Sequence, residues 1–334
     1  MIIKVKNKAL YLQIISILKH NELTYYEVNE QDHYLVTSID ITNLLTNIDE
    51  HAYEIINYQD YYFVSKAFKK STSFKVKDVN FNKDNFVIIG GPCAVESSIQ
   101  MKETLAYLNK TQTDCLRVGL FKPRTSPTSF QGLRANGFDI INNLNIKMPL
   151  VGELTSINEV LAYHQNFDII QIGARNMQNF ELLKVVATIN KPIILKRGFA
   201  NTIKELLCSA EYLYLNGATQ IILCERGLRT FENAYRNVLD LNGVAYLKLK
   251  THLPIIVDPS HGTGDASLVS SLALASIMVK ADGLMIETHY QPSLALSDGK
   301  QALNPHQYQK LIKQIRATHA FYQQLNNDED DEDE

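Results

Sequence analysis

The chain has two patterns of hydrophobic and polar positions, and the change between them falls near residue 85. Residues 1–64 alternate short strand-like runs with one segment of clear helical periodicity, "ALYLQIISILKH". A second helix is expected at 40–48, with Asp40 as its N-cap. The resulting order, β-α-β-β-α-β, is typical of a ferredoxin-like α+β domain.

From residue 85 onward, apolar runs alternate with helix-like segments. Eight runs follow one another: "FVIIG" (86–90), "CLRVG" (115–119), "PLVGEL" (149–154), "DIIQIG" (168–173), "PIILKRG" (192–198), "QIILCERG" (220–227), "PIIVDPS" (254–260) and "GLMIETH" (283–289). Near-continuous apolar strands of this kind are buried on both faces of a parallel sheet. Eight of them favour a (β/α)8 TIM barrel over an open sheet.

These patterns predict four segments. We expect a ferredoxin-like domain at 1–64, a polar, Lys-rich linker at 65–84 and the barrel at 85–325. The remaining segment, 326–334, is a run of like charges with nothing to bury, which is typical of a disordered acidic tail.

Composition excludes several classes of protein. The 334 residues are 45% hydrophobic and 21% charged, and the net charge of −3 provides no basic field for nucleic acid. No segment approaches the roughly 20 apolar residues of a membrane span, and the first residues lack the apolar block of a signal peptide. The four cysteines show no CxxC spacing. We therefore expect a cytoplasmic protein that binds neither nucleic acid nor membrane.

Charged side chains gather where the apolar runs end. The C-terminal strand ends of a barrel meet at one face, which is where barrel enzymes keep their active sites. Six cations belong to this set: Arg117, Lys122, Arg124, Arg175, Lys196 and Arg226. Burying them without partners costs several kcal/mol each, so phosphate or carboxylate groups of a substrate are the expected partners.

A second set at the strand ends contains potential metal ligands: Cys93, His261, Glu287 and Asp298. A thiolate, an imidazole and two carboxylates could hold a divalent transition metal and leave one position open for substrate. Scattered His and Cys residues are more often structural. The spacing alone leaves both interpretations open.

Seven strings together resemble the 3-deoxy-D-arabino-heptulosonate 7-phosphate (DAHP) synthase family. They are "GPCAVES", "FKPRTSPTSFQGL", "IQIGARNMQNFELL", "LKRGFANTIKELLCSAEYL", "ILCERGLRTFENAYRN", "VDPSHGTG" and "GLMIETH" with "ALSDGKQAL". The resemblance is to the smaller type I branch, which includes 3-deoxy-octulosonate 8-phosphate synthase, and it covers about 85–304. It implies condensation of phosphoenolpyruvate with erythrose 4-phosphate, the first step of the shikimate pathway.

The resemblance also implies roles for individual residues. The phosphoenolpyruvate phosphate is assigned to Arg175, Arg226 and the backbone N–H of Ala174, and its carboxylate and reacting carbon to Arg117, Lys122 and Lys196. The sugar phosphate is assigned to Arg124, Thr125 and Ser126. The ligands of one divalent metal ion (Mn²⁺, Fe²⁺, Zn²⁺ or Co²⁺) are Cys93, His261, Glu287 and Asp298. With His261, the catalytic residues include Lys122 as the proton donor to the aldehyde oxygen and Glu153, which positions the attacking water.

Two alternatives remain at this point. Octulosonate 8-phosphate synthase acts on arabinose 5-phosphate, but it usually has Lys-Ala-Asn-Arg where this chain has Lys122-Pro123-Arg124-Thr125. A non-catalytic, ligand-sensing barrel would have lost matched residues, and none is missing. The resemblance further implies a homo-oligomer, with a tetramer favoured, and feedback inhibition by tyrosine or phenylalanine bound at the 1–64 domain.

Overall fold

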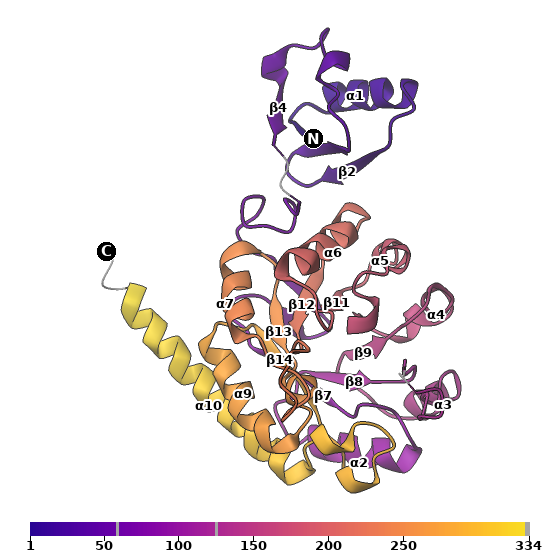
Figure 1. Ribbon diagram of the computed structural model, residues 1–334, viewed down its shortest axis with the longest axis vertical. Helices are drawn as coiled ribbons and strands as arrows, with labels where there is room; N and C mark the ends of the chain where they lie inside the picture. The colour runs from indigo at the N-terminus through magenta and orange to yellow at the C-terminus, as the bar shows by residue number, and fades with distance from the viewer. Residues whose placement is uncertain (58–59, 124–125, 331–334) are drawn as a thin grey trace.

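The structure, a computed structural model, describes residues 1–57, 60–123 and 126–330, and its largest part is a closed barrel of eight parallel strands (Figure 1). The neighbour order around the barrel is β10-β11-β12-β13-β14-β7-β8-β9. The strands are β7 (Val87–Gly91), β8 (Cys115–Val118), β9 (Leu150–Glu153), β10 (Ile169–Ile172), β11 (Ile193–Lys196), β12 (Ile221–Glu225), β13 (Ile255–Val257) and β14 (Gly283–Glu287). Seven lie within the predicted apolar runs and β7 ends one residue beyond its run, so the predicted (β/α)8 barrel is confirmed.

Helices follow the strands and surround the barrel (Figure 1). They are α2 (Ser98–Leu108), α3 (Asn136–Asn142), α4 (Ile157–Tyr163), α5 (Phe180–Ala187), α6 (Ile203–Leu215), α7 (Leu241–Lys250), α8 (Pro259–Thr263), α9 (Ala266–Met278) and α10 (Pro305–Asp330). Short 3₁₀ turns are η3 (His164–Asn166), η4 (Ala174–Asn176), η5 (Pro292–Leu294) and η6 (Gly299–Gln301). In the described ranges, no helix combines the length and the apolar character needed to cross a membrane.

The last helix continues into the segment that was expected to be disordered. Its N-terminal part is anchored by Leu311 and Ile315, which are fully buried, and the helix extends to Asp330. Once the first turns are fixed, adding further turns requires no new nucleation. The helix thus includes 326–330 of the segment predicted as a disordered tail, whose disorder stays a prediction, and 331–334 lie outside the described residues.

The predicted linker at 65–84 contains a β-hairpin that covers one end of the barrel. The hairpin consists of β5 (Phe74–Val76) and β6 (Val79–Phe81). Val76 and Phe81 are buried in one cluster with inward-facing strand residues such as Val87 and Ile89, near the N-terminal ends of the strands. The segment is polar and Lys-rich overall, so its composition did not indicate the few apolar positions that close this end of the barrel, which we call the floor.

Residues 1–57 form an antiparallel sheet with strand order β2-β3-β1-β4 (Figure 1). Its elements are β1 (Ile2–Val5), α1 (Lys8–His20), β2 (Tyr25–Asn29), β3 (His33–Thr37), η1 (Thr42–Leu44), η2 (Glu50–Ala52) and β4 (Tyr53–Ile56). The helix expected at 40–48 was wrong: Asp40 accepts a hydrogen bond from the Thr42 N–H, but only a 3₁₀ turn follows. Ile41 and Leu45 are both buried in the domain core, and a short turn is enough to place them there.

The N-terminal domain packs on the barrel through the chain that connects them. Glu211 on α6 is buried, and its carboxylate accepts hydrogen bonds from the N–H groups of Phe63 (3.1 Å) and Val64 (3.0 Å). The Phe63 ring lies 6.0 Å from the ring of Tyr214, also on α6. The connection is thus held against α6 instead of lying in solvent.

Candidate active site

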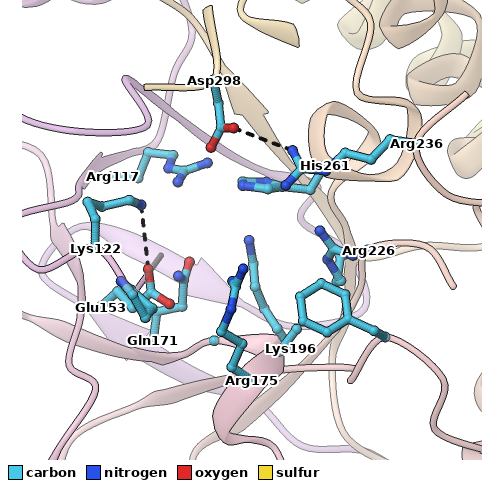
Figure 2. Close-up of a pocket in the computed structure, with 14 residues that line it drawn as sticks. Arg117, Lys122, Glu153, Gln171, Arg175, Lys196, Arg226, Arg236, His261 and Asp298 are labelled. Atoms are coloured by element: carbon cyan, nitrogen blue, oxygen red, sulfur yellow. Dashed lines mark hydrogen bonds and ion pairs between the residues drawn. The ribbon is translucent and has the colours of Figure 1, made fainter. Parts of the chain in front are cut away.

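Side chains from the C-terminal strand ends surround one pocket (Figure 2). Figure 2 shows Arg117, Lys196 and Arg226 reaching into it from different strand ends. The lining includes Arg117, Lys122, Glu153, Gln171, Ala174, Arg175, Lys196, Phe199, Arg226, Arg236, His261 and Asp298. Arg and Lys side chains outnumber the carboxylates in this lining, so the pocket favours anionic ligands.

The four predicted metal ligands lie together beside this pocket. One ligand atom from each of Cys93, His261, Glu287 and Asp298 lies within 4.8 Å of all the others. Cys93 Sγ is 3.1 Å from Asp298 Oδ2, and His261 Nε2 is 3.4 Å from Glu287 Oε1. Glu287 ends β14, Cys93 follows β7, His261 lies on α8 after β13, and Asp298 precedes η6, so only the closed barrel brings them together.

The donor atoms of this cluster are directed as a metal ion requires. His261 Nδ1 lies 2.7 Å from Asp258 Oδ2, so Nδ1–H donates to that carboxylate and the Nε2 lone pair faces the cluster. Glu287 is fully buried; its Oε2 accepts from Gln301 Nε2 at 2.6 Å. Its Oε1 forms no hydrogen bond in the described part of the chain, although it pairs with Arg117 Nη1 at 2.8 Å. A buried carboxylate oxygen that forms no hydrogen bond and lies beside an imidazole lone pair fits a divalent metal.

The protonation of the cluster is consistent with this fit. Burial lowers the pKa of His261, which keeps the imidazole neutral. Burial alone would raise the pKa of Glu287, but His261 and Arg117 outweigh it, and the net pKa is lowered. Burial, followed by the nearby Glu287 carboxylate, raises the pKa of the Cys93 thiol to about 12. A cation of charge two is the partner that would stabilise a thiolate here.

Among the described residues, six cations line the pocket; Arg236 pairs with Asp298 (3.5 Å) and donates to Gln301 Oε1 (2.8 Å), and the other five divide into two groups. Three are buried and paired with carboxylates: Arg117 with Glu287 (2.8 Å), Lys122 with Glu153 (3.6 Å) and Lys196 with Asp258 (2.5 Å). The second group is Arg175 and Arg226, at the ends of β10 and β12, which lie near the Phe199 ring. Burial lowers the pKa of the Arg226 guanidinium, which identifies it as a desolvated cation.

Comparison with known protein families shows which family has this sequence. The profile of the DAHP synthetase I family matches residues 66–323. The chain belongs to the DAHP synthetase I family. The match begins in the segment before the barrel and ends within α10, so it includes every residue of the pocket.

Individual enzymes are similar to this chain in sequence and in structure. The chain is 45% identical over 259 residues to a phospho-2-dehydro-3-deoxyheptonate aldolase of Thermotoga maritima, covering 77% of each protein. A 2-dehydro-3-deoxyphosphooctonate aldolase of Dichelobacter nodosus is 30% identical over 273 residues, covering 72% of this chain and 95% of that protein. The crystal structure of the Thermotoga maritima enzyme, a DAHP synthase, superposes with a TM-score of 0.76 at 37% identity, covering 95% of this chain and 96% of that one.

Most of the predicted site residues meet in this family member's pocket, and some do not. The exceptions lie in the loop after β8. Ser126 is exposed and pairs with Thr128 at 2.9 Å, outside the pocket lining, while Arg124 and Thr125 lie outside the described residues. The sequence interpretation missed other residues of the site: Gln171, Phe199, Arg236, Asp258 and Gln301. Gln171 had a readable signal, since it is the one polar residue inside the apolar run "IIQI".

Proposed function

We propose that the protein is a 3-deoxy-7-phosphoheptulonate synthase, which condenses phosphoenolpyruvate with erythrose 4-phosphate and releases inorganic phosphate. The observation that carries this proposal is the set of cations that lines the pocket beside the Cys93, His261, Glu287 and Asp298 cluster. Two phosphorylated, acidic substrates account for the cations. The higher identity to the heptonate enzyme than to the octonate enzyme favours the four-carbon sugar phosphate.

In this proposal the cations hold and orient the two anions. Arg175, Arg226 and the Ala174 N–H bind the phosphoenolpyruvate phosphate, while Arg117, Lys122 and Lys196 surround its carboxylate and reacting carbon. Arg124, Thr125 and Ser126 bind the sugar phosphate. Positioning two mutually repelling anions for attack is a large part of the catalytic effect.

The cluster would hold one divalent ion through Cys93 Sγ, His261 Nε2 and the carboxylates of Glu287 and Asp298. When bound, such an ion supplies Lewis-acid polarisation of a substrate carbonyl. Asp258 fixes the His261 tautomer that this role needs, and Gln301 holds one oxygen of Glu287 away from the cluster.

Lys122 is the proposed proton donor, and Glu153 is the residue proposed to position the attacking water. Burial lowers the pKa of Lys122, but Cys93 and Glu153 outweigh it and raise the net value, so the amine is charged at neutral pH. As C3 of the enol phosphate bonds to the aldehyde carbon, Lys122 Nζ donates a proton to the aldehyde oxygen. Glu153 positions the water that adds to C2, after which the C–O bond to phosphate breaks.

The test follows phosphate release by the purified, metal-loaded protein. Phosphoenolpyruvate is supplied with either erythrose 4-phosphate or arabinose 5-phosphate. We expect turnover with erythrose 4-phosphate to be far faster. A preference for arabinose 5-phosphate would transfer the assignment to the octulosonate enzyme, and no turnover with either sugar would refute the proposal.

A further inference from the structure

One aromatic ring contacts three arginines at the edge of the pocket. The guanidinium carbons of Arg175, Arg226 and Arg229 lie 5.2, 4.9 and 4.4 Å from the centroid of the Phe199 ring. The four residues come from the loops after three consecutive strands, β10, β11 and β12. Phe199 is half-buried and lines the pocket, whereas Arg229 is exposed.

A ring positions an arginine differently from a carboxylate. The negative face of the π system attracts a guanidinium within about 6 Å of the centroid. The ring neither neutralises the charge nor accepts the N–H groups that would bind phosphate oxygens. Lys122 and Lys196, in contrast, are each paired with a carboxylate.

Arg226 illustrates this difference. It is buried, and its Nη1 donates to the Gly227 carbonyl at 3.3 Å. Within the described ranges it forms no ion pair with a carboxylate. The Asp258 carboxylate favours the charged form of this desolvated cation without an ion pair, and the Phe199 ring packs against the guanidinium without neutralising it, so the charge remains available to an anionic ligand.

The backbone around Phe199 is held from both neighbouring loops. The Arg229 N–H donates to the Phe199 carbonyl at 2.7 Å, which joins the β12 loop to the β11 loop. The Gly198 N–H donates to Met177 Sδ at 3.1 Å, which joins the β11 loop to the β10 loop. The ring is thus attached to both of the loops that carry its arginines.

We propose that Phe199 is a positioning residue for a three-arginine phosphate site, and that Arg229 is the third, outermost cation of that site. The ring holds Arg175 and Arg226 beside each other against their mutual repulsion, and Arg229 extends the cationic surface to the pocket mouth. This inference rests on the proposed function, because it assumes that Arg175 and Arg226 bind the phosphoenolpyruvate phosphate.

The test compares Phe199→Leu, which removes the ring, with Phe199→Tyr, which keeps it. Steady-state kinetics of the metal-loaded full chain give KM for each substrate, kcat and the inhibition constant of inorganic phosphate. In Phe199→Leu, KM for phosphoenolpyruvate and the phosphate inhibition constant should both rise about three- to tenfold. KM for erythrose 4-phosphate should change less than KM for phosphoenolpyruvate. The factor by which kcat falls should be smaller than the factor by which KM for phosphoenolpyruvate rises. Phe199→Tyr should restore values near those of the wild type.

Two further variants complete the design. Arg229→Gln should raise the inhibition constant of inorganic phosphate, as Phe199→Leu should. Phe180→Leu is the matched control, because Phe180 is also half-buried but lies outside the pocket, where its ring stacks on Tyr212 with centroids 4.4 Å apart. The kinetic constants of Phe180→Leu should match those of the wild type. Thermal unfolding of every variant reports whether the fold is retained.

The proposal is overturned if Phe199→Leu, still folded, keeps wild-type constants for phosphoenolpyruvate and phosphate, or if Phe199→Tyr fails to restore them. Unchanged phosphate binding in Arg229→Gln would remove Arg229 from the site. Calorimetric titration with inorganic phosphate separates this inference from the proposed function. If the wild type binds phosphate more tightly than Phe199→Leu but turns over neither sugar phosphate, only the proposed function fails.

Discussion

Asp258 shows how single residues determine the geometry of this site. Its side chain is fully buried, and its Oδ2 contacts both Lys196 Nζ at 2.5 Å and His261 Nδ1 at 2.7 Å. Burial alone would raise the pKa of Asp258, but His261 and Lys196 outweigh it and hold the pKa well below its usual value. One carboxylate therefore connects a proposed metal ligand, His261, to a proposed substrate-binding cation, Lys196.

Cys93→Ser should weaken metal retention. Thiolate is the one soft ligand in a set of nitrogen and oxygen donors, and replacing a direct ligand should reduce metal affinity by more than about tenfold. Metal content after dialysis and titration with Mn²⁺ measure the effect without relying on activity. Cys208→Ser, on α6 and outside the cluster, is the control and should retain metal as the wild type does. Equal retention by Cys93→Ser would exclude Cys93 as a ligand.

Lys122→Gln should reduce kcat by about 100-fold or more, because it removes the proposed general acid. The side chain keeps a polar end of similar length, so the pocket should stay folded. Single-turnover rates at saturating substrate measure the chemical step, and phosphate binding at Arg175 and Arg226 should remain. An unchanged rate would assign the proton donor to another group.

At the scale of elements, segments outside the eight apolar runs complete the barrel. The β5–β6 hairpin closes the floor, and the connection between the domains is held by α6 and by the residues before β13. His252 belongs to the second contact: its Nε2 lies 2.7 Å from the Phe63 carbonyl, and its Nδ1 lies 2.6 Å from Thr72 Oγ1. Both contacts suit a neutral imidazole, with Nε2–H as the donor and Nδ1 as the acceptor.

Phe81→Ala should lower the free energy of unfolding by about 3–5 kcal/mol, as is typical when a buried aromatic side chain is removed. Phe81 is almost fully buried, and its ring stacks on Phe74 with centroids 5.1 Å apart. Urea denaturation measures the change. Phe321→Ala, at an exposed position on α10, serves as the control and should have little effect. A small effect at Phe81 would mean that the hairpin does not stabilise the floor.

The pH dependence of stability should reveal His252. Burial lowers the pKa of His252 below its ordinary value of 6.5; the hydrogen bond to the Phe63 carbonyl opposes this shift, and Lys69 assists it. The unfolded chain therefore binds a proton near pH 6.5 that the folded chain still excludes, so stability is complete above this pH and decreases as the pH falls below it. Between pH 7.5 and about 5.5, the unfolding temperature of His252→Gln should therefore fall less than that of the wild type. His20→Gln, at an exposed end of α1, should keep the wild-type slope. An identical slope in His252→Gln would contradict the prediction.

At the scale of the whole molecule, the catalytic pocket and the N-terminal domain are separate. Every residue that lines the pocket lies between Arg117 and Asp298, whereas the N-terminal domain contacts α6 on the outside of the barrel (Figure 1). In the described part of the chain, the pocket lining therefore includes no side chain from residues 1–64.

A chain that begins at Ser71 should keep most of its turnover and lose any response to tyrosine or phenylalanine. We propose that these amino acids act through residues 1–64, a coupling that is typically about 1–3 kcal/mol. The shortened chain should also unfold at a lower temperature, since removing Phe63 exposes Tyr214. Activity with and without each amino acid, at millimolar concentration, measures the response. Insensitivity of the full chain, or equal sensitivity of both chains, would refute a regulatory role.

Much of the barrel and its chemistry could be predicted from the sequence. The eight strands are readable because parallel strands buried on both faces need continuous apolar runs, as in "PIILK". Cys93, His261, Glu287 and Asp298 could be proposed as one cluster because the fold sends strand ends to one face and the resemblance matched these four residues. The errors occurred where few residues carry the structure, as at Ile41, Leu45 and Phe81.

Only the tertiary structure decided which side chains touch. No periodicity shows that Asp258 contacts both Lys196 and His261, or that Phe199 lies against arginines from two other loops. Local patterns report how one segment is buried, since each side chain's burial follows the repeat of its own strand or helix. Contacts between strand ends depend on the closure and register of the whole barrel, to which all eight strands contribute at once.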